Sequence, residues 1–135
     1  MTLATEPSSA GEARAALEPF RDAIDPLAFT DLRLVVSELV VDAVIAEADE
    51  PESDIELRAS LSSDCVRVEL EQGAVAYKLA PRRAEPGEAG WGLQLAQQLS
   101  DRWGVKRGGR CSGVWIELYL PDRDAADGGE EQRAA

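Results

Sequence analysis

The feature that most constrains the fold is a mainly apolar run over residues 32–46, whose only acidic residues are Glu38 and Asp42. Valine, leucine and isoleucine side chains surround most of a helix built from this run, which predicts that the rest of the protein buries it. Glu38 and Asp42 lie four positions apart and fall on one narrow stripe with Asp31. Like charges at this spacing destabilise a helix by roughly 0.2–0.5 kcal/mol. A cation, a hydrogen-bond donor or a phosphate-bound metal facing the stripe would offset the repulsion; alternatively, the stripe is the solvated face of the helix.

Length and charge limit the classes of function. The 135 residues fit one domain with a single core, expected over residues 1–121, followed by a disordered acidic tail over residues 122–135. Asp and Glu number 26 against 14 Lys and Arg, and the net charge of −12 disfavours nucleic acid and anionic membranes as direct partners. The absence of histidine excludes histidine acid–base catalysis, a Ser-His-Asp triad and histidine-ligated zinc. No signal peptide or membrane-spanning run is recognisable, so we expect a cytoplasmic protein.

Two helical segments are expected near the start of the chain. A serine-capped helix over residues 8–23 should be bent or split by Pro19. A break at residues 25–26 separates it from the long apolar helix, for which Thr30 or Asp31 is the predicted N-cap.

Alternation of apolar and polar residues predicts two hairpins, each with one buried face. Turn-forming residues separate the strands of each hairpin, and a short edge strand is expected close to the N-terminus. The predicted strands are residues 3–5, 55–61, 66–70, 105–107 and 113–120.

Between the hairpins, residues 76–89 predict an ordered loop or lid, because prolines interrupt them and no apolar period is sustained. Gly90 then opens a helix in which Leu95, Ala96, Leu99 and Trp103 recur at helical spacing. The resulting order is helix, helix, hairpin, loop, helix, hairpin. This order favours an α+β two-layer sandwich over a doubly wound parallel sheet.

Glycines at the start of this last helix indicate a candidate anion site. Gly90 and Gly92 would let backbone N–H groups approach an anion at a helix N-terminus, where the helix dipole favours negative charge. Arg82 and Arg83 in the preceding loop add two cations within reach. The alternatives are a turn or packing point for the glycines and a solvated pair for the arginines.

Several motifs together resemble a known family. They are SELVVDAV at residues 37–44, GWGLQL at 90–95, LSDRWGV at 99–105 and VWIEL at 114–118. These motifs resemble the histidine-kinase-like ATPase domains over about residues 10–121, and more narrowly the anti-sigma-factor serine kinases and their small relatives in high-GC Gram-positive bacteria. The resemblance implies a Bergerat-type ATP-binding fold, with helices on one face of a mixed, mostly antiparallel sheet, and ATP and Mg²⁺ as cofactors.

The resemblance assigns roles on the acidic helix and the loop. Glu38 matches the glutamate that activates the attacking hydroxyl or water. Asp42 stands where the family has an asparagine that ligates the magnesium between the phosphates, so a further negative charge would face a polyphosphate. Arg82 or Arg83 would contact phosphate.

The base-binding motif departs from the family, whereas the second glycine box is intact. Gln72 stands in place of the aspartate that accepts a hydrogen bond from the adenine amino group, and Gly73 or Glu71 could substitute only with a shift of one residue. Two of the family's glycines are alanines, at positions 74 and 76, whose methyl groups would crowd the base. Gly90, Gly92 and Leu93 match the second glycine box.

Two functions follow from the resemblance, and a third is independent of it. The first is an anti-sigma-factor-like regulator that binds partners with weakened or lost ATP binding. The second is an active Mg-ATP-dependent serine kinase that phosphorylates an anti-sigma-factor antagonist. The implied partners are a sigma factor, such an antagonist, or a second copy of the chain in a homodimer. The third is an α+β domain with an unrelated role, in which the acidic stripe is only a solvated helix face.

Overall fold

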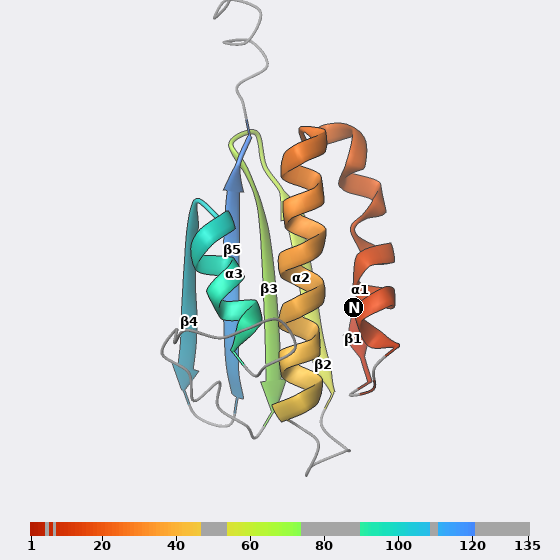
Figure 1. The fold of residues 1–135 in the computed structure, drawn as a ribbon, viewed down its shortest axis with the longest axis vertical. Coiled ribbons are helices and arrows are strands. Elements are labelled where there is room, and N and C mark those ends of the chain that lie inside the picture. Colours follow the sequence, from red (N-terminus) through yellow and green to blue (C-terminus); the bar gives the residue numbers. More distant parts are fainter. Residues whose placement is uncertain (5, 7, 47–53, 74–89, 109–110, 121–135) are drawn as a thin grey trace, which may run out of the picture.

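The computed structural model describes residues 1–4, 6, 8–46, 54–73, 90–108 and 111–120. It has the α+β arrangement that the sequence predicts, with the helices on one face of a five-stranded sheet (Figure 1). In chain order the elements are β1 (Thr2–Leu3), α1 (Ser9–Ala16), the 3-10 helix η1 (Glu18–Ala23), α2 (Pro26–Ala46), β2 (Ile55–Leu61), β3 (Cys65–Gly73), α3 (Trp91–Leu99), β4 (Arg102–Gly108) and β5 (Cys111–Tyr119).

The strands lie in the order β1-β2-β3-β5-β4, and all four pairings between the described strands are antiparallel. Both predicted hairpins are present, as β2–β3 and β4–β5. β3 is central: Leu70 lies opposite Leu57 on one side and Val114 on the other. After β3 the chain passes through α3 to the edge strand β4 and returns as β5 between β4 and β3.

Alternate strand residues face the helices and form the core with α2. Helix α2 contacts α3 and α1, and it lies between them over the sheet (Figure 1). Fully burying a valine or leucine side chain contributes roughly 1.5–3 kcal/mol, so this layer supplies most of the driving force for folding. The core residues from α2 and the central strands include Leu32, Val35, Val36, Leu39, Val40, Ala43, Leu57, Val66, Val68, Leu70, Val114, Ile116 and Leu118.

The opposite face of the sheet carries paired charges. Arg67 forms ion pairs with Glu69 at 2.8 Å and with Glu117 at 3.2 Å, and its guanidinium lies 4.3 Å from the centre of the Trp115 ring. Lys106 reaches Glu69 at 3.3 Å. Each such surface pair contributes only about 0–1 kcal/mol to the stability of the fold.

The long helix begins earlier than the sequence predicts. Thr30 and Asp31 were the expected caps, but α2 starts at Pro26, and Asp25 accepts hydrogen bonds from the backbone N–H groups of Leu27 at 3.1 Å and Ala28 at 3.3 Å. Proline suits the first helical position because the N–H it lacks would have no partner there. The pair that predicted a break is therefore a capped helix start.

Two further predictions need correction, and one is confirmed. Trp103 was expected on the last helix, but α3 ends at Leu99 because Ser100 is extended, with φ −92° and ψ 153°, and Trp103 pairs with Ile116 in the sheet. The edge strand was expected over residues 3–5, but it begins at Thr2 and ends at Leu3, and residue 5 lies outside the described residues. Pro19 does split the first helical segment, and it lies in the first turn of η1. The predicted loop over residues 76–89 and the tail over residues 122–135 lie outside the described residues.

We expect Asp25→Ala to lower the free energy of unfolding by about 1 kcal/mol, because two N–H groups at the start of α2 lose their acceptor. Urea denaturation measures this change. Asp25→Asn keeps an oxygen acceptor and should lose much less. Equal losses in both variants would show that the cap is not the cause.

Candidate functional site

Asp42 lies inside the protein, against the start of α3. Its side chain is 4% exposed, and its Oδ2 atom accepts a hydrogen bond of 2.8 Å from the backbone N–H of Gly92. Among the carboxyl side chains of the described residues, it is the one that is buried. For Asp42, the solvated-face interpretation of the acidic stripe is therefore wrong.

Glycine is required twice where α3 begins. Gly90 has φ 94°, in the left-handed region that disfavours residues with a side chain. A Cβ atom on Gly92 would lie 2.7 Å from the backbone nitrogen of Leu39 and 2.8 Å from Oδ2 of Asp42. The first turn of α3 therefore packs directly on the backbone of α2.

The environment of Asp42 opposes its ionisation. Burial raises the pKa of Asp42 from its ordinary value near 3.8 to about 6, and the negative charge of Glu38 adds to the increase. The backbone N–H groups of Gly92 and Gly90 act in the opposite direction, because they stabilise the carboxylate. Glu38, one turn earlier on α2, is only partly buried and remains accessible to water.

Gln72 is the second buried polar residue of this region. It is 1% exposed, near the end of β3, and its Nε2 donates a hydrogen bond of 3.0 Å to the carbonyl of Ala43, the residue after Asp42. Its Oε1 is buried with no hydrogen-bond partner among the described residues. An unpaired buried acceptor costs about 1–3 kcal/mol.

The comparison with protein families supplies the identification. The chain matches the histidine kinase-like ATPase domain over residues 3–118. It belongs to this family. Comparison with curated proteins gives no match. The α+β architecture, with helices on one face of an antiparallel sheet, is consistent with membership of the histidine kinase-like ATPase family.

In a histidine kinase-like ATPase domain, the resemblance implies that Asp42 and Gln72 stand where Mg-ATP would bind. Within the described residues, no three acidic or cysteine side chains gather in a way that could hold a metal ion. The carboxylate at the expected magnesium position already accepts the N–H of Gly92. The position at which the resemblance implies recognition of adenine, here called the base end, is different. There Oε1 of Gln72 has no hydrogen-bond partner among the described residues. At the metal end the Asp42 carboxylate therefore already holds one backbone donor, and at the base end one buried acceptor is unpaired among the described residues.

The structure brings some predicted residues together and not others. Glu38 and Asp42 meet Gly92 at the α2–α3 contact, with Gly90 one residue before α3. Leu93 is fully buried in the hydrophobic core. Gly73 ends β3 opposite residue 111. Arg82, Arg83 and the alanines at 74 and 76 lie outside the described residues.

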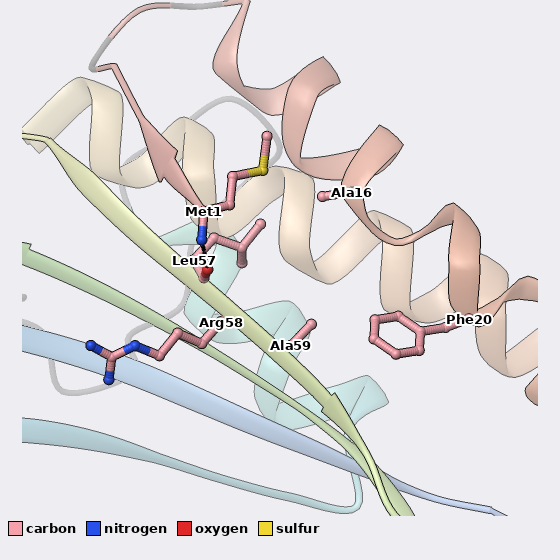
Figure 2. A pocket seen from close by; sticks show the side chains of 6 residues that line it. All are labelled: Met1, Ala16, Phe20, Leu57, Arg58 and Ala59. Carbon is pink, nitrogen blue, oxygen red and sulfur yellow. Dashed lines mark hydrogen bonds between the residues drawn. The ribbon is translucent and has the colours of Figure 1, made fainter.

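Sequence analysis did not predict a pocket of about 330 Å³ between the first helices and β2. Figure 2 shows Phe20 and Ala16 reaching it from the helices and Leu57 from β2, and the Met1 amino group donates to the Leu57 carbonyl at 2.9 Å. No sequence motif marks this pocket, because it forms where the N-terminus meets β2. In the described part of the chain, no helix combines the length and the apolar character needed to cross a membrane.

We expect Gly92→Ala to destabilise the fold by roughly 1–3 kcal/mol, because the added methyl would overlap the backbone of α2. Gly11→Ala in α1 is the matched control. Its Cβ would meet only Arg14 Nη2, at 3.6 Å, so the better helix propensity of alanine should stabilise by roughly 0.5–1 kcal/mol. Thermal and urea unfolding of both variants measure the difference; a neutral Gly92→Ala would contradict the close packing.

Asp42→Asn should become more stable than the parent protein as pH rises. The folded parent holds the Asp42 proton more tightly than the unfolded chain does. The protonated side chain therefore adds to the free energy of unfolding below about pH 4, and this addition is lost as pH rises through about 6. Asparagine does not titrate, so the difference in unfolding free energy should grow by up to about 3 kcal/mol between pH 4 and 7. Asp31→Asn is the control, and a constant difference for Asp42→Asn would show that Asp42 titrates normally.

Proposed function

We propose that this histidine kinase-like ATPase domain is an anti-sigma-factor-like regulatory protein that acts by binding partner proteins, with weakened or lost ATP binding. The observation that carries the proposal is the buried Asp42 carboxylate bound to the N–H of Gly92. It stands at the position for which the resemblance implies a magnesium-binding asparagine. The sequence departures at Gln72 and at positions 74 and 76 support the same conclusion.

The charge of Asp42 supports weakened ATP binding. Two like unit charges 4 Å apart repel by about 1 kcal/mol in water and about 4 kcal/mol at the effective dielectric near a protein surface. An ionised Asp42 would meet several phosphate charges, and Glu38 adds another charge nearby. An asparagine at position 42 would carry no such repulsion.

The outer stripe of α2 supports partner binding. Leu27 is 78% exposed and Leu34 is 42% exposed, and with Asp31 and Glu38 they fall within one narrow stripe, at i, i+4, i+7 and i+11. A stripe that alternates apolar and acidic residues matches a partner with apolar and basic side chains. The net charge of −12 favours the same kind of partner, such as a basic surface of a sigma factor.

The active-kinase alternative is favoured by one observation. Glu38 is accessible to water and lies at the α2–α3 contact, where the family would place the attacking hydroxyl. In this alternative Glu38 would orient or deprotonate a serine hydroxyl of an anti-sigma-factor antagonist.

Binding of the purified protein to the sigma factors and antagonists of its source organism tests the proposal. We expect at least one of them to bind without added ATP, and Leu34→Arg to weaken that binding by tenfold or more because it places a charge on the stripe. Leu61→Arg is the matched control, because Leu61 is also 42% exposed but lies on β2. Absence of any such partner would contradict the proposal, and phosphate transfer from ATP to an antagonist serine would establish the kinase alternative.

A further inference from the structure

We propose that residues 59–61 on the outer side of β2, here called the open β2 edge, form a docking site for an extended peptide segment of a partner protein. The segment would pair with β2 as a further antiparallel strand. It would place an apolar side chain in the neighbouring pocket and an acidic side chain beside Arg58. This surface consists of other residues than the α2 stripe and the α2–α3 contact, so it is a second binding site beyond the proposed function.

The backbone of β2 is only partly paired on its outer side. There β1 and the N-terminus cover it as far as Leu57, which exchanges hydrogen bonds of 2.8 and 2.9 Å with Met1. Because backbone groups of a strand alternate between its two sides, Ala59 and Leu61 direct their N–H and C=O groups to the same outer side. No strand of the described residues pairs with them there. The open β2 edge therefore offers donors and acceptors for one more strand.

The two edges of the sheet differ in their protection against further pairing. The opposite edge strand, β4, carries the charged side chains of Arg102 and Lys106, which are typical of edges that avoid pairing. The open β2 edge has neither a charge nor a proline, and the side chain of Leu61 is 42% exposed. An uncharged edge with free backbone groups is the surface that an extended peptide recognises by strand addition.

The pocket of about 330 Å³ lies on the helix-facing side of this edge. Ala16 and Phe20 line it from the helices and Ala59 from β2 (Figure 2). These three apolar side chains pack against the core but are only partly buried. Side chains directly opposite each other in an antiparallel pair lie on the same face of the sheet, so the peptide residue opposite Ala59 would point into the pocket. An apolar lining of this volume suits a large apolar side chain such as leucine.

The other face of this edge offers a cation. Arg58 precedes Ala59 on β2, so its side chain points away from the pocket, and it is 61% exposed. Its Nη1 atom lies 3.8 Å from Oε1 of Glu71, an oxygen that also lies 3.9 Å from Nζ of Lys106. An acidic side chain of the peptide on this face would give Arg58 a closer partner.

Met1 fixes the order of the two recognised residues. It lies opposite Leu57, so an added strand in line with β1 has little room opposite Arg58. The acidic residue therefore lies opposite Ser60, and in an antiparallel strand that position immediately precedes the one opposite Ala59. The expected ligand sequence is an acidic residue followed directly by a large apolar one.

Titration of the full chain with a defined probe, followed by nuclear magnetic resonance, tests the docking site. The probe is a capped hexapeptide, Thr-Val-Thr-Asp-Leu-Gly, and two control peptides replace its leucine by serine or its aspartate by asparagine. We expect the probe to bind with a Kd below about 1 mM, to shift the amide resonance of Ala59 and to slow the exchange of that amide with solvent. The serine control should bind at least about tenfold more weakly, because it leaves the pocket unfilled.

Two variants of the chain separate the pocket from the charge. Ala16→Leu fills the pocket from α1 without changing β2, and it should weaken binding of the probe by about tenfold or more. Ala15→Leu, at an exposed position of the same helix, should bind the probe as the parent does. Arg58→Gln should weaken binding of the probe by about two- to fivefold and leave binding of the asparagine control unchanged.

Three results would overturn the proposal. They are an Ala59 amide that does not respond to about 5 mM probe, a serine control that binds as tightly as the probe, and an Ala16→Leu variant that binds like the parent. A parent protein that sediments as a dimer, with the Ala59 amide protected before any probe is added, would assign the edge to a second copy and would also overturn it. Circular dichroism identifies a variant that fails to fold, and the serine control on the parent protein then still decides the result.

Discussion

A carboxylate carried into the core by an apolar helix must find hydrogen-bond donors, and this requirement organises the helical layer. Asp42 finds the backbone N–H groups at the start of α3, and Gly92 allows the two helices to approach closely enough for the bond to form. The contact fixes α3 against α2 and thereby directs the chain towards the far edge of the sheet, where β4 begins. Burial of the apolar faces drives folding, and this polar contact joins the first turn of α3 to α2.

Periodicity and turn residues predicted the two hairpins and the order of elements, and this order in turn predicted the two-layer class. The split of the first helix followed from Pro19 itself, because proline disrupts a helix interior. The start of α2 was not predicted, because an aspartate–proline pair is typical both of a break in a helix and of a capped helix start. Trp103 fits a helical period with Leu99, but the turn at Ser100 ends the helix and strand pairing decides the conformation that follows. These errors lie at boundaries, where local signals compete.

The site shows a different limit of sequence reasoning. For the acidic stripe the sequence left a cation, a hydrogen-bond donor, a phosphate-bound metal or a solvated face open, and for the glycines an anion site, a turn or a packing point. In the structure Asp42 and Gly92 satisfy each other, and Gly92 is also a point of close packing. The carbonyl of Ala43, which orients Gln72, carries no sequence signal because every residue has one. A histidine kinase-like ATPase domain can thus keep its architecture with an internal anion where the family resemblance implies a magnesium-bound phosphate.

The pH dependence of the Gly92 amide resonance, followed by nuclear magnetic resonance, tests the central claim most directly. If Gly92 donates to a carboxylate whose pKa is raised to about 6, its amide proton shift should titrate with a midpoint near that pH in the parent protein. The same resonance should not change with pH in Asp42→Asn. A Gly92 resonance that ignores pH in the parent, or that titrates equally in both proteins, would contradict the assignment of Asp42 as the internal anion.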